Sequence, residues 1–289
     1  MNGALPKIYT GQEGEYEKHA ILSDIHGFHV DVHALSVTLA ALNNCPLDVL
    51  HLNGDTLDVP NLMGENKHKF SIDDEDVSLI EEIDFTYEHI LKPLRKAVGK
   101  KTRIIFRLGN HEARLIRIDA GNRRGLRELL EAANKQSCSP TDFAKLLRFD
   151  ELGIELDRGV EKENYRTDTS FIQKKHDRGT VTHGWLTNAN RCKKYIETFH
   201  SSGTSGHTHA MKSEIIPWVD GNLGWYESGC LCKKTGVGFF PLGKPSLWTH
   251  GFVTMWRNKY DGTMFWNQHK IEDYTLEFRG KTYSTHPHA

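Results

Sequence analysis

Five short apolar runs, each followed by polar residues that can bind a metal ion, constrain the fold of this chain more than any other feature. The runs occupy residues 19–22, 47–52, 102–108, 179–182 and 200–205. Short segments of this length, bounded by Gly, Asn, Asp and Ser, are typical of buried strands rather than helices. We therefore predict a strand at each of the five positions.

Helical patterns lie between these runs. Apolar residues recur at helical spacing in four segments, which cover residues 30–44, 74–98, 139–149 and 188–199. Pro93 lies inside the second segment and is expected to kink or end that helix, because proline lacks the backbone N–H. Strands that alternate with helices indicate an α/β sandwich.

The domain organisation follows from the length and from a change in character along the chain. We predict one domain over 1–289, because 289 residues suffice for a well-buried core. The charged stretch 112–178 exceeds what a crossover needs and is interpreted as a helical insertion. The part at 212–284 is aromatic and β-branched, and its Asp261-Gly262 pair predicts a hairpin.

Composition and charge exclude several classes of protein. No run approaches the roughly 18 apolar residues of a transmembrane helix, and the first residues do not resemble a secretory signal. Five irregularly spaced cysteines favour a reducing, cytoplasmic compartment. The net charge of −1 argues against strong steering toward nucleic acid. The acidic stretch 73–91 and the basic tract 99–127 are predicted to be solvated faces. For the basic tract, the alternative is a surface that attracts anions.

Residues that could bind metal ions follow all five predicted strands. They are Asp24, His26, Asp55, Asn110, His111, His183, His207 and His209. Ligands of open α/β sheets bind beyond the carboxyl ends of strands, so these side chains are expected to converge. Eight candidates exceed the four ligands of a single structural zinc. Their mixture of carboxylate, amide and imidazole suits a pair of ions such as Mn²⁺, Fe²⁺ or Zn²⁺.

Taken together, these motifs resemble the calcineurin-like metallophosphoesterase superfamily. The order is Asp24-x-His26, Gly54-Asp55, Gly109-Asn110-His111-Glu112, His183-Gly184 and Gly206-His207-x-His209. The resemblance implies a metallophosphoesterase-type β-sandwich of two mixed sheets flanked by helices, in α/β/β/α layers. The C-terminal "WYESGCL" and "WTHGF" resemble phage and bacterial metallophosphoesterases that lack an assigned substrate.

The resemblance also implies roles for individual residues. One ion would be bound by Asp24, His26 and His209, the other by Asn110, His183 and His207, and Asp55 would bridge them. The cofactors would be two divalent ions, with Mn favoured and Fe, Zn and Ni as alternatives. A hydroxide between them would be the nucleophile, and His111 the general acid. Glu112 would orient a histidine from the second shell.

One motif departs from the pattern of the protein phosphatases of this superfamily. These enzymes carry Arg-Gly where this chain has Val59 and Pro60, so an arginine that holds phosphate is missing. We therefore favour phosphodiesters as substrates, either nucleotides or nucleic-acid ends. The alternatives are a phosphomonoesterase acting on nucleotides or proteins, a strand-cleaving nuclease, and a non-catalytic scaffold that binds other proteins.

Three further residues are candidates for supporting roles. Asp58 is either a second-shell hydrogen-bond acceptor or a turn residue. Arg114 either reaches the substrate phosphate or lies on the surface, and Trp185 either flanks the pocket and stacks on a base or belongs to the core. The expected partner is a phosphoester, with nucleotide and nucleic acid as candidates and no membrane. The sequence leaves the oligomeric state open.

Overall fold

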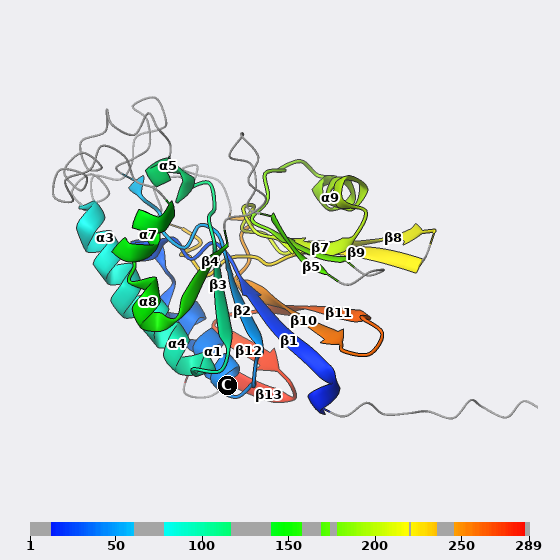
Figure 1. Ribbon diagram of the computed structural model, residues 1–289, viewed down its shortest axis with the longest axis horizontal. Helices are drawn as coiled ribbons and strands as arrows, with labels where there is room; N and C mark the ends of the chain where they lie inside the picture. Colours follow the sequence, from blue (N-terminus) through cyan, green and yellow to red (C-terminus); the bar gives the residue numbers. More distant parts are fainter. Residues whose placement is uncertain are drawn as a thin grey trace, which may run out of the picture.

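Two β-sheets pack face to face, with helices on their outer sides, in the computed structural model of the chain (Figure 1). The structure describes residues 13–60, 78–116, 140–157, 169–173, 178–219, 221–235 and 246–286. The α/β/β/α layering confirms the fold class predicted from the sequence.

The first sheet has the strand order β11-β10-β1-β2-β3-β4. Its strands are β1 (Tyr16–Leu22), β2 (Val49–Asn53), β3 (Arg103–Arg107), β4 (Ile154–Asp157), β10 (Gly251–Asn258) and β11 (Met264–Lys270). Strands β1 to β4 are parallel, whereas β10 is antiparallel to both of its neighbours, β1 and β11, so the sheet is mixed. The antiparallel pairing of β10 with β11 confirms the hairpin predicted from the Asp-Gly turn.

The second sheet has the order β5-β6-β7-β9-β8 and is also mixed. Its strands are β5 (Thr169–Gln173), β6 (Arg178–Thr182), β7 (Ser202–Ser205), β8 (Ser213–Trp218) and β9 (Gly221–Glu227). A separate hairpin joins β12 (Thr275–Phe278) to β13 (Lys281–Ser284). All five strands predicted from the apolar runs are thus present, as β1, β2, β3, β6 and β7.

Helices cover the outer face of each sheet. The elements are η1 (Glu13–Glu15), η2 (Gly27–His29), α1 (Val32–Asn43), α3 (Leu79–Phe85), the π-helical η4 (Thr86–Leu91), α4 (Lys92–Val98), α5 (Ala113–Ile116), α7 (Pro140–Leu146), α8 (Phe149–Leu152) and α9 (Arg191–Phe199). Helix α9 lies over the second sheet, whereas α1, α3, α4 and α8 lie over the first (Figure 1). Among the described residues, no helix has both the length and the apolar character needed to cross a membrane.

The long helical segment begins with a capping box, in which Ser78 and Glu81 exchange side-chain-to-backbone hydrogen bonds. Of the two outcomes expected at Pro93, a kink or an end of the helix, the end does not occur, because helix continues to Val98. A π-helical stretch precedes the proline, and such a bulge is a known way to accommodate a break in the helical hydrogen-bond ladder.

The core divides into three layers because side chains of a strand alternate between its two faces. Leu50 and Leu52 of β2 belong to the large cluster that also includes buried residues of the helices α1, α3 and α4. Ile21 of β1 instead packs with Val181 of the second sheet. A third cluster joins α9 to Trp225 of β9. Each sheet therefore has a helical layer on one side and the other sheet on its opposite side.

The proposed boundaries within the chain stay predictions. The stretch 112–178 contains α5, α7 and α8, but also β4 of the first sheet and β5 of the second. Residues 117–139 and 158–168 lie outside the described structure.

Candidate metal centre

The predicted metal-binding residues gather where the carboxyl ends of β1, β2 and β3 of the first sheet meet those of β6 and β7 of the second. They lie in the loops that directly follow these strands: Asp24 and His26 after β1, Asp55 after β2, Asn110 and His111 after β3, His183 after β6, and His207 and His209 after β7. Parallel strands place their carboxyl ends at one sheet edge, and the two sheets face each other, so one site receives loops from both.

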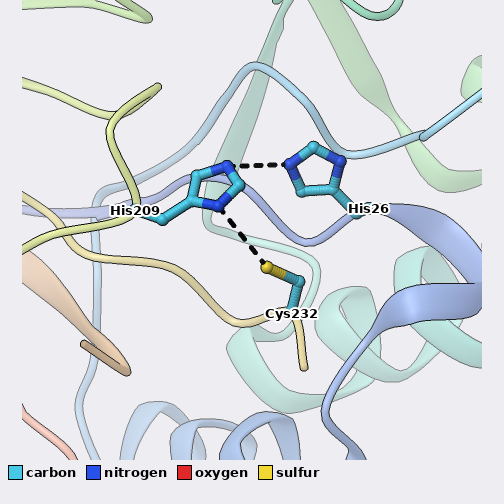
Figure 2. A group of neighbouring side chains, drawn as sticks. All are labelled: His26, His209 and Cys232. Atoms are coloured by element: carbon cyan, nitrogen blue, oxygen red, sulfur yellow. Dashed lines mark hydrogen bonds between the residues drawn. The ribbon is translucent and has the colours of Figure 1, made fainter. Parts of the chain in front are cut away.

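Asp24, His26 and His209 form the first group of donors. The Nε2 atom of His209 lies 3.1 Å from the Oδ1 atom of Asp24 and 3.1 Å from the Nε2 atom of His26. Figure 2 shows the His209 ring between His26 and Cys232, whose Sγ atom lies 3.9 Å from the Nδ1 atom of His209. The resemblance implied that these three donors bind one ion, and they do lie together.

Asn110, His183 and His207 form the second group. The Oδ1 atom of Asn110 lies 3.1 Å from His183 Nε2 and 2.9 Å from His207 Nδ1. The Oδ2 atom of Asp55 lies 3.0 Å from His183 Nε2. Asp55 shares one compact donor set with His183 and His207 and another with His26 and His111. It therefore stands where a ligand shared by two ions would stand.

Hydrogen bonds fix which ring nitrogens present a lone pair to the site. The Nδ1 atom of His183 lies 2.9 Å from the backbone oxygen of Asn53, which can only accept, so this nitrogen carries the proton. Likewise, the Nδ1 atom of His26 lies 3.0 Å from the carboxylate of Asp58. In both rings Nε2 then presents its lone pair to the other donors of the site, the arrangement that outer-shell partners impose on metal-binding histidines.

The spacing of the donors fits a divalent ion. Metal–nitrogen bonds of about 2.1 Å at angles of 90–109° place neighbouring ligand atoms about 3.0–3.4 Å apart. The His26–His209 separation of 3.1 Å and the Asn110–His183 separation of 3.1 Å both fall in that range. Coordination of a divalent cation is therefore compatible with both groups.

Backbone conformation is unusual at the same residues. Positive φ angles occur at Asp24, His26, Asp55, His207 and His209, with values between 50° and 69°. This left-handed region is costly for residues other than glycine, and such residues cluster at functional sites. Gly54 has φ 84°, and a Cβ atom there would lie 2.6 Å from the ring of His183. These loops are thus held in conformations that bring the donors together.

The charges of the site suit a cation at neutral pH. Burial lowers the pKa of His26 to about 4, so its ring is neutral. Burial and the neighbouring His183 also lower the pKa of His207. Burial opposes the ionisation of Asp55, but His111 and His183 outweigh it and hold the pKa of this carboxyl well below its usual range. Neutral imidazoles and ionised carboxylates are the forms that bind metal.

His111 lies beside these donors and points its two ring nitrogens in different directions. Its Nδ1 atom lies 2.7 Å from the backbone oxygen and 2.9 Å from the Oδ1 atom of Asp58. Its Nε2 atom lies 3.8 Å from Asp55 Oδ2. Asp58 is thus a buried partner of both His26 and His111, and its role in the second shell of a metal stays a prediction.

Glu112 holds the loop after β2 rather than a histidine ring, which corrects the role expected from the resemblance. Its fully buried carboxylate accepts hydrogen bonds from the backbone N–H groups of Asp55, Thr56, Leu57 and Gly109. A carboxylate that gathers several N–H groups of one loop fixes the path of that loop. Glu112 therefore acts on the position of Asp55.

Glu82 lies in the acidic stretch for which a solvated face is predicted, and the sequence did not mark it as a functional residue. It is buried and accepts hydrogen bonds from the backbone N–H groups of Asp58 and Val59. Burial and the adjacent Asp58 raise the pKa of Glu82 to about 7. The sequence did contain one indication that Glu82 is buried: it lies on the same helical face as the apolar Leu79 and Ile83.

The structure describes the side chain of Trp185 but not that of Arg114, the two remaining candidates for supporting roles. Trp185 is 47% exposed, two residues beyond His183, and its ring packs edge-on against Tyr195 and Phe199. It is therefore not a core residue. The side chain of Arg114 and most of the second half of the basic tract lie outside the described residues.

Comparisons with known proteins assign this chain to no family. No protein-family model matches the chain, and no curated protein matches it. Among solved structures, Vps29 from Cryptosporidium parvum shows 11% identity and a TM-score of 0.42 over 93% of this chain and 99% of that one. Purple acid phosphatase PPD1 from yellow lupin shows 12% identity and a TM-score of 0.41 over 89% of this chain and 54% of that one. At these scores the similarities do not bear on function.

The arrangement of the sheets and of the motif residues agrees with the expectation from the sequence. Two mixed sheets lie between helical layers, and the residues of all five motifs meet at one edge in the expected order. The fold that the resemblance implied, two mixed sheets between helical layers, is thereby confirmed.

Proposed function

We propose that this protein is a hydrolase of phosphoric esters that depends on two divalent metal ions and favours phosphodiesters. The observation that carries the proposal is the convergence of seven donors in two adjacent groups, with Asp55 between them. The members are Asp24, His26 and His209 in one group and Asn110, His183 and His207 in the other.

Bound ions would supply an activated water for attack on phosphorus and would neutralise charge on the phosphoryl oxygens. The residues of the chain supply position and a proton. Asp58 holds Nδ1 of His111, so Nε2 is the atom that faces the site and can donate to the leaving oxygen. The carboxylate of Asp58, 2.9 Å from the ring, stabilises the protonated imidazole that a general acid must be.

Two features support diesters over monoesters. Val59 occupies the place of the phosphate-holding arginine of protein phosphatases, and it is fully buried, so no cation is available at that position. Trp185 presents an exposed indole two residues after His183. An exposed aromatic ring can stack on a nucleobase, and such stacking is tolerant of base identity.

The proposal is tested by comparing bis-p-nitrophenyl phosphate with p-nitrophenyl phosphate as substrates of the Mn²⁺-loaded protein. Both release the same chromophore, so the ratio of kcat/KM reports the preference for diester over monoester. We expect faster turnover of the diester. A reversed ratio would replace the diesterase by a phosphomonoesterase, whereas metal binding without cleavage of any ester in a broad panel would favour the scaffold.

Asp55→Asn is the matched variant for the metal centre. The substitution keeps the shape but removes the charge between the two donor groups, so metal content and rate should both fall steeply. Asp261→Asn, at the exposed β-turn between β10 and β11, makes the same chemical change far from the site. An Asp55→Asn protein with unchanged metal content and rate would remove the shared-ligand role.

A further inference from the structure

We infer that Glu227 is a positioning residue of the metal centre, acting through Thr208 on the loop that carries His207 and His209. The inference deepens the proposed function and rests on it. Glu227 belongs to the "WYESGCL" stretch and lies at the end of β9. It would hold the two histidines in position without itself being a metal ligand.

Glu227 is fully buried and has two partners from different parts of the fold. Arg191, at the start of α9, places Nε 2.6 Å from Oε1 and Nη2 2.6 Å from Oε2. The hydroxyl of Thr208 donates to Oε1 at 2.8 Å. A buried carboxylate needs such compensation, because desolvation of an unpaired charge is costly. The two-point pairing with arginine fixes the orientation of the carboxylate, so Oε1 is a stationary acceptor for Thr208.

Thr208 lies between the two histidines in the chain, so its hydrogen bond to Glu227 also restrains the positions of His207 and His209. His207 and His209 both have positive φ angles, of 69° and 58°, and their rings belong to different donor groups. The backbone N–H of Thr208 donates to the oxygen of Gly206 at 2.8 Å, which closes the turn. A single anchor at Thr208 therefore acts on both groups at once.

The register of the second sheet explains why β9 supplies the anchor. Strands β7 and β9 are parallel neighbours, with Ser205 paired to Glu227, so the end of β9 lies directly beside the loop that leaves β7. The backbone oxygen of Glu227 also accepts a hydrogen bond from Gln268 of β11, which ties the same residue to the first sheet. The anchor is therefore attached to both sheets and to α9.

Thr208→Val is the decisive variant, because it keeps the size and branching of the side chain and removes only the hydroxyl. Loss of outer-shell partners typically lowers metal affinity 10- to 100-fold. We expect a reduction of about that size for Mn²⁺, measured by titration of the metal-free protein, with little change in its unfolding midpoint. Thr208→Ser, which restores the hydroxyl, should recover most of the affinity.

Thr198→Val is the matched control, since Thr198 lies on the exposed face of α9 and its hydroxyl donates to the backbone oxygen of Lys194 in the same helix. It should bind Mn²⁺ like the wild type. Glu227→Gln should weaken binding in the same direction as Thr208→Val, and if this variant fails to fold, the threonine series decides the question alone.

The outcomes separate the two proposals. Wild-type Mn²⁺ affinity in Thr208→Val, or no recovery in Thr208→Ser, overturns the positioning role while the metal centre stands. Wild-type protein that binds no Mn²⁺, or His207→Ala protein that binds as tightly as wild type, overturns both.

Discussion

Replacement of Glu82 by glutamine should change how the stability of the metal-free protein depends on pH. The carboxyl of Glu82 is buried against the loop after β2, and burial with the nearby Asp58 raises its pKa from 4.5 to about 7. A carboxyl with a raised pKa in the folded state binds more protons folded than unfolded. Its contribution to stability is therefore full below pH 4.5 and is lost as the pH rises through 7.

The magnitude follows from the two values. At 1.36 kcal/mol per pH unit, a rise from 4.5 to about 7 corresponds to about 3 kcal/mol, of which about 2.5 kcal/mol falls between pH 5 and pH 8. Glutamine cannot ionise and has nearly the same shape. The free energy of unfolding of wild type should therefore fall by about 2.5 kcal/mol relative to Glu82→Gln across that range.

Urea unfolding in the presence of a chelator, at pH 5, 6.5 and 8, measures this difference. The comparison between variant and wild type cancels the titration of all other groups. Glu88→Gln is the control, because Glu88 lies on the same helical segment but is half exposed beside Lys92. A Glu82→Gln difference that stays constant between pH 5 and pH 8 would refute the account of a buried, protonated carboxyl.

The remaining predictions concern catalysis, packing and a second titrating group. His111→Ala should reduce the rate on esters with poor leaving groups far more than on p-nitrophenyl esters, and equal losses in steady-state assays would argue against a general acid. Trp225→Ala should lower the free energy of unfolding by about 3–5 kcal/mol in urea titrations, since the ring is fully buried and stacked on Tyr195; a loss below 1 kcal/mol would contradict this packing. Burial lowers the pKa of His269 to about 4, so wild type should lose up to about 2 kcal/mol relative to His269→Gln as the pH falls from 7 to 5. Parallel stability curves over that range would show that His269 titrates normally.

Local patterns were sufficient for most of the donor set. Each donor lies in the loop that directly follows a strand. The strands can be predicted from short apolar runs that end in glycine and polar residues. The carboxyl ends of parallel strands lie at one edge of a sheet, so the donors are expected to converge there even when no contact between them is known. Asp24, Asp55 and His183 could be named for this reason, although they are far apart along the chain.

The residues that support the donors could not be found in this way. Glu82 and Glu227 have the appearance of surface charges in the sequence, because burial of a carboxylate depends on partners from distant segments. Cys232 directly follows the "WYESGCL" stretch, but nothing in that stretch indicates a metal site, and Cys232 reaches His209 only through the fold.

The sequence by itself determined where the main strands lie and which side chains stand at their ends, because both depend on neighbours in the chain. Only the tertiary structure decided that β8 and β9 join one sheet while β10 and β11 join the other. The backbone edge of a strand offers the same N–H and C=O groups to any partner, so pairing is selected by the packing of whole layers. The same packing placed Glu227 beside Thr208 and gave the donor loops their strained shape.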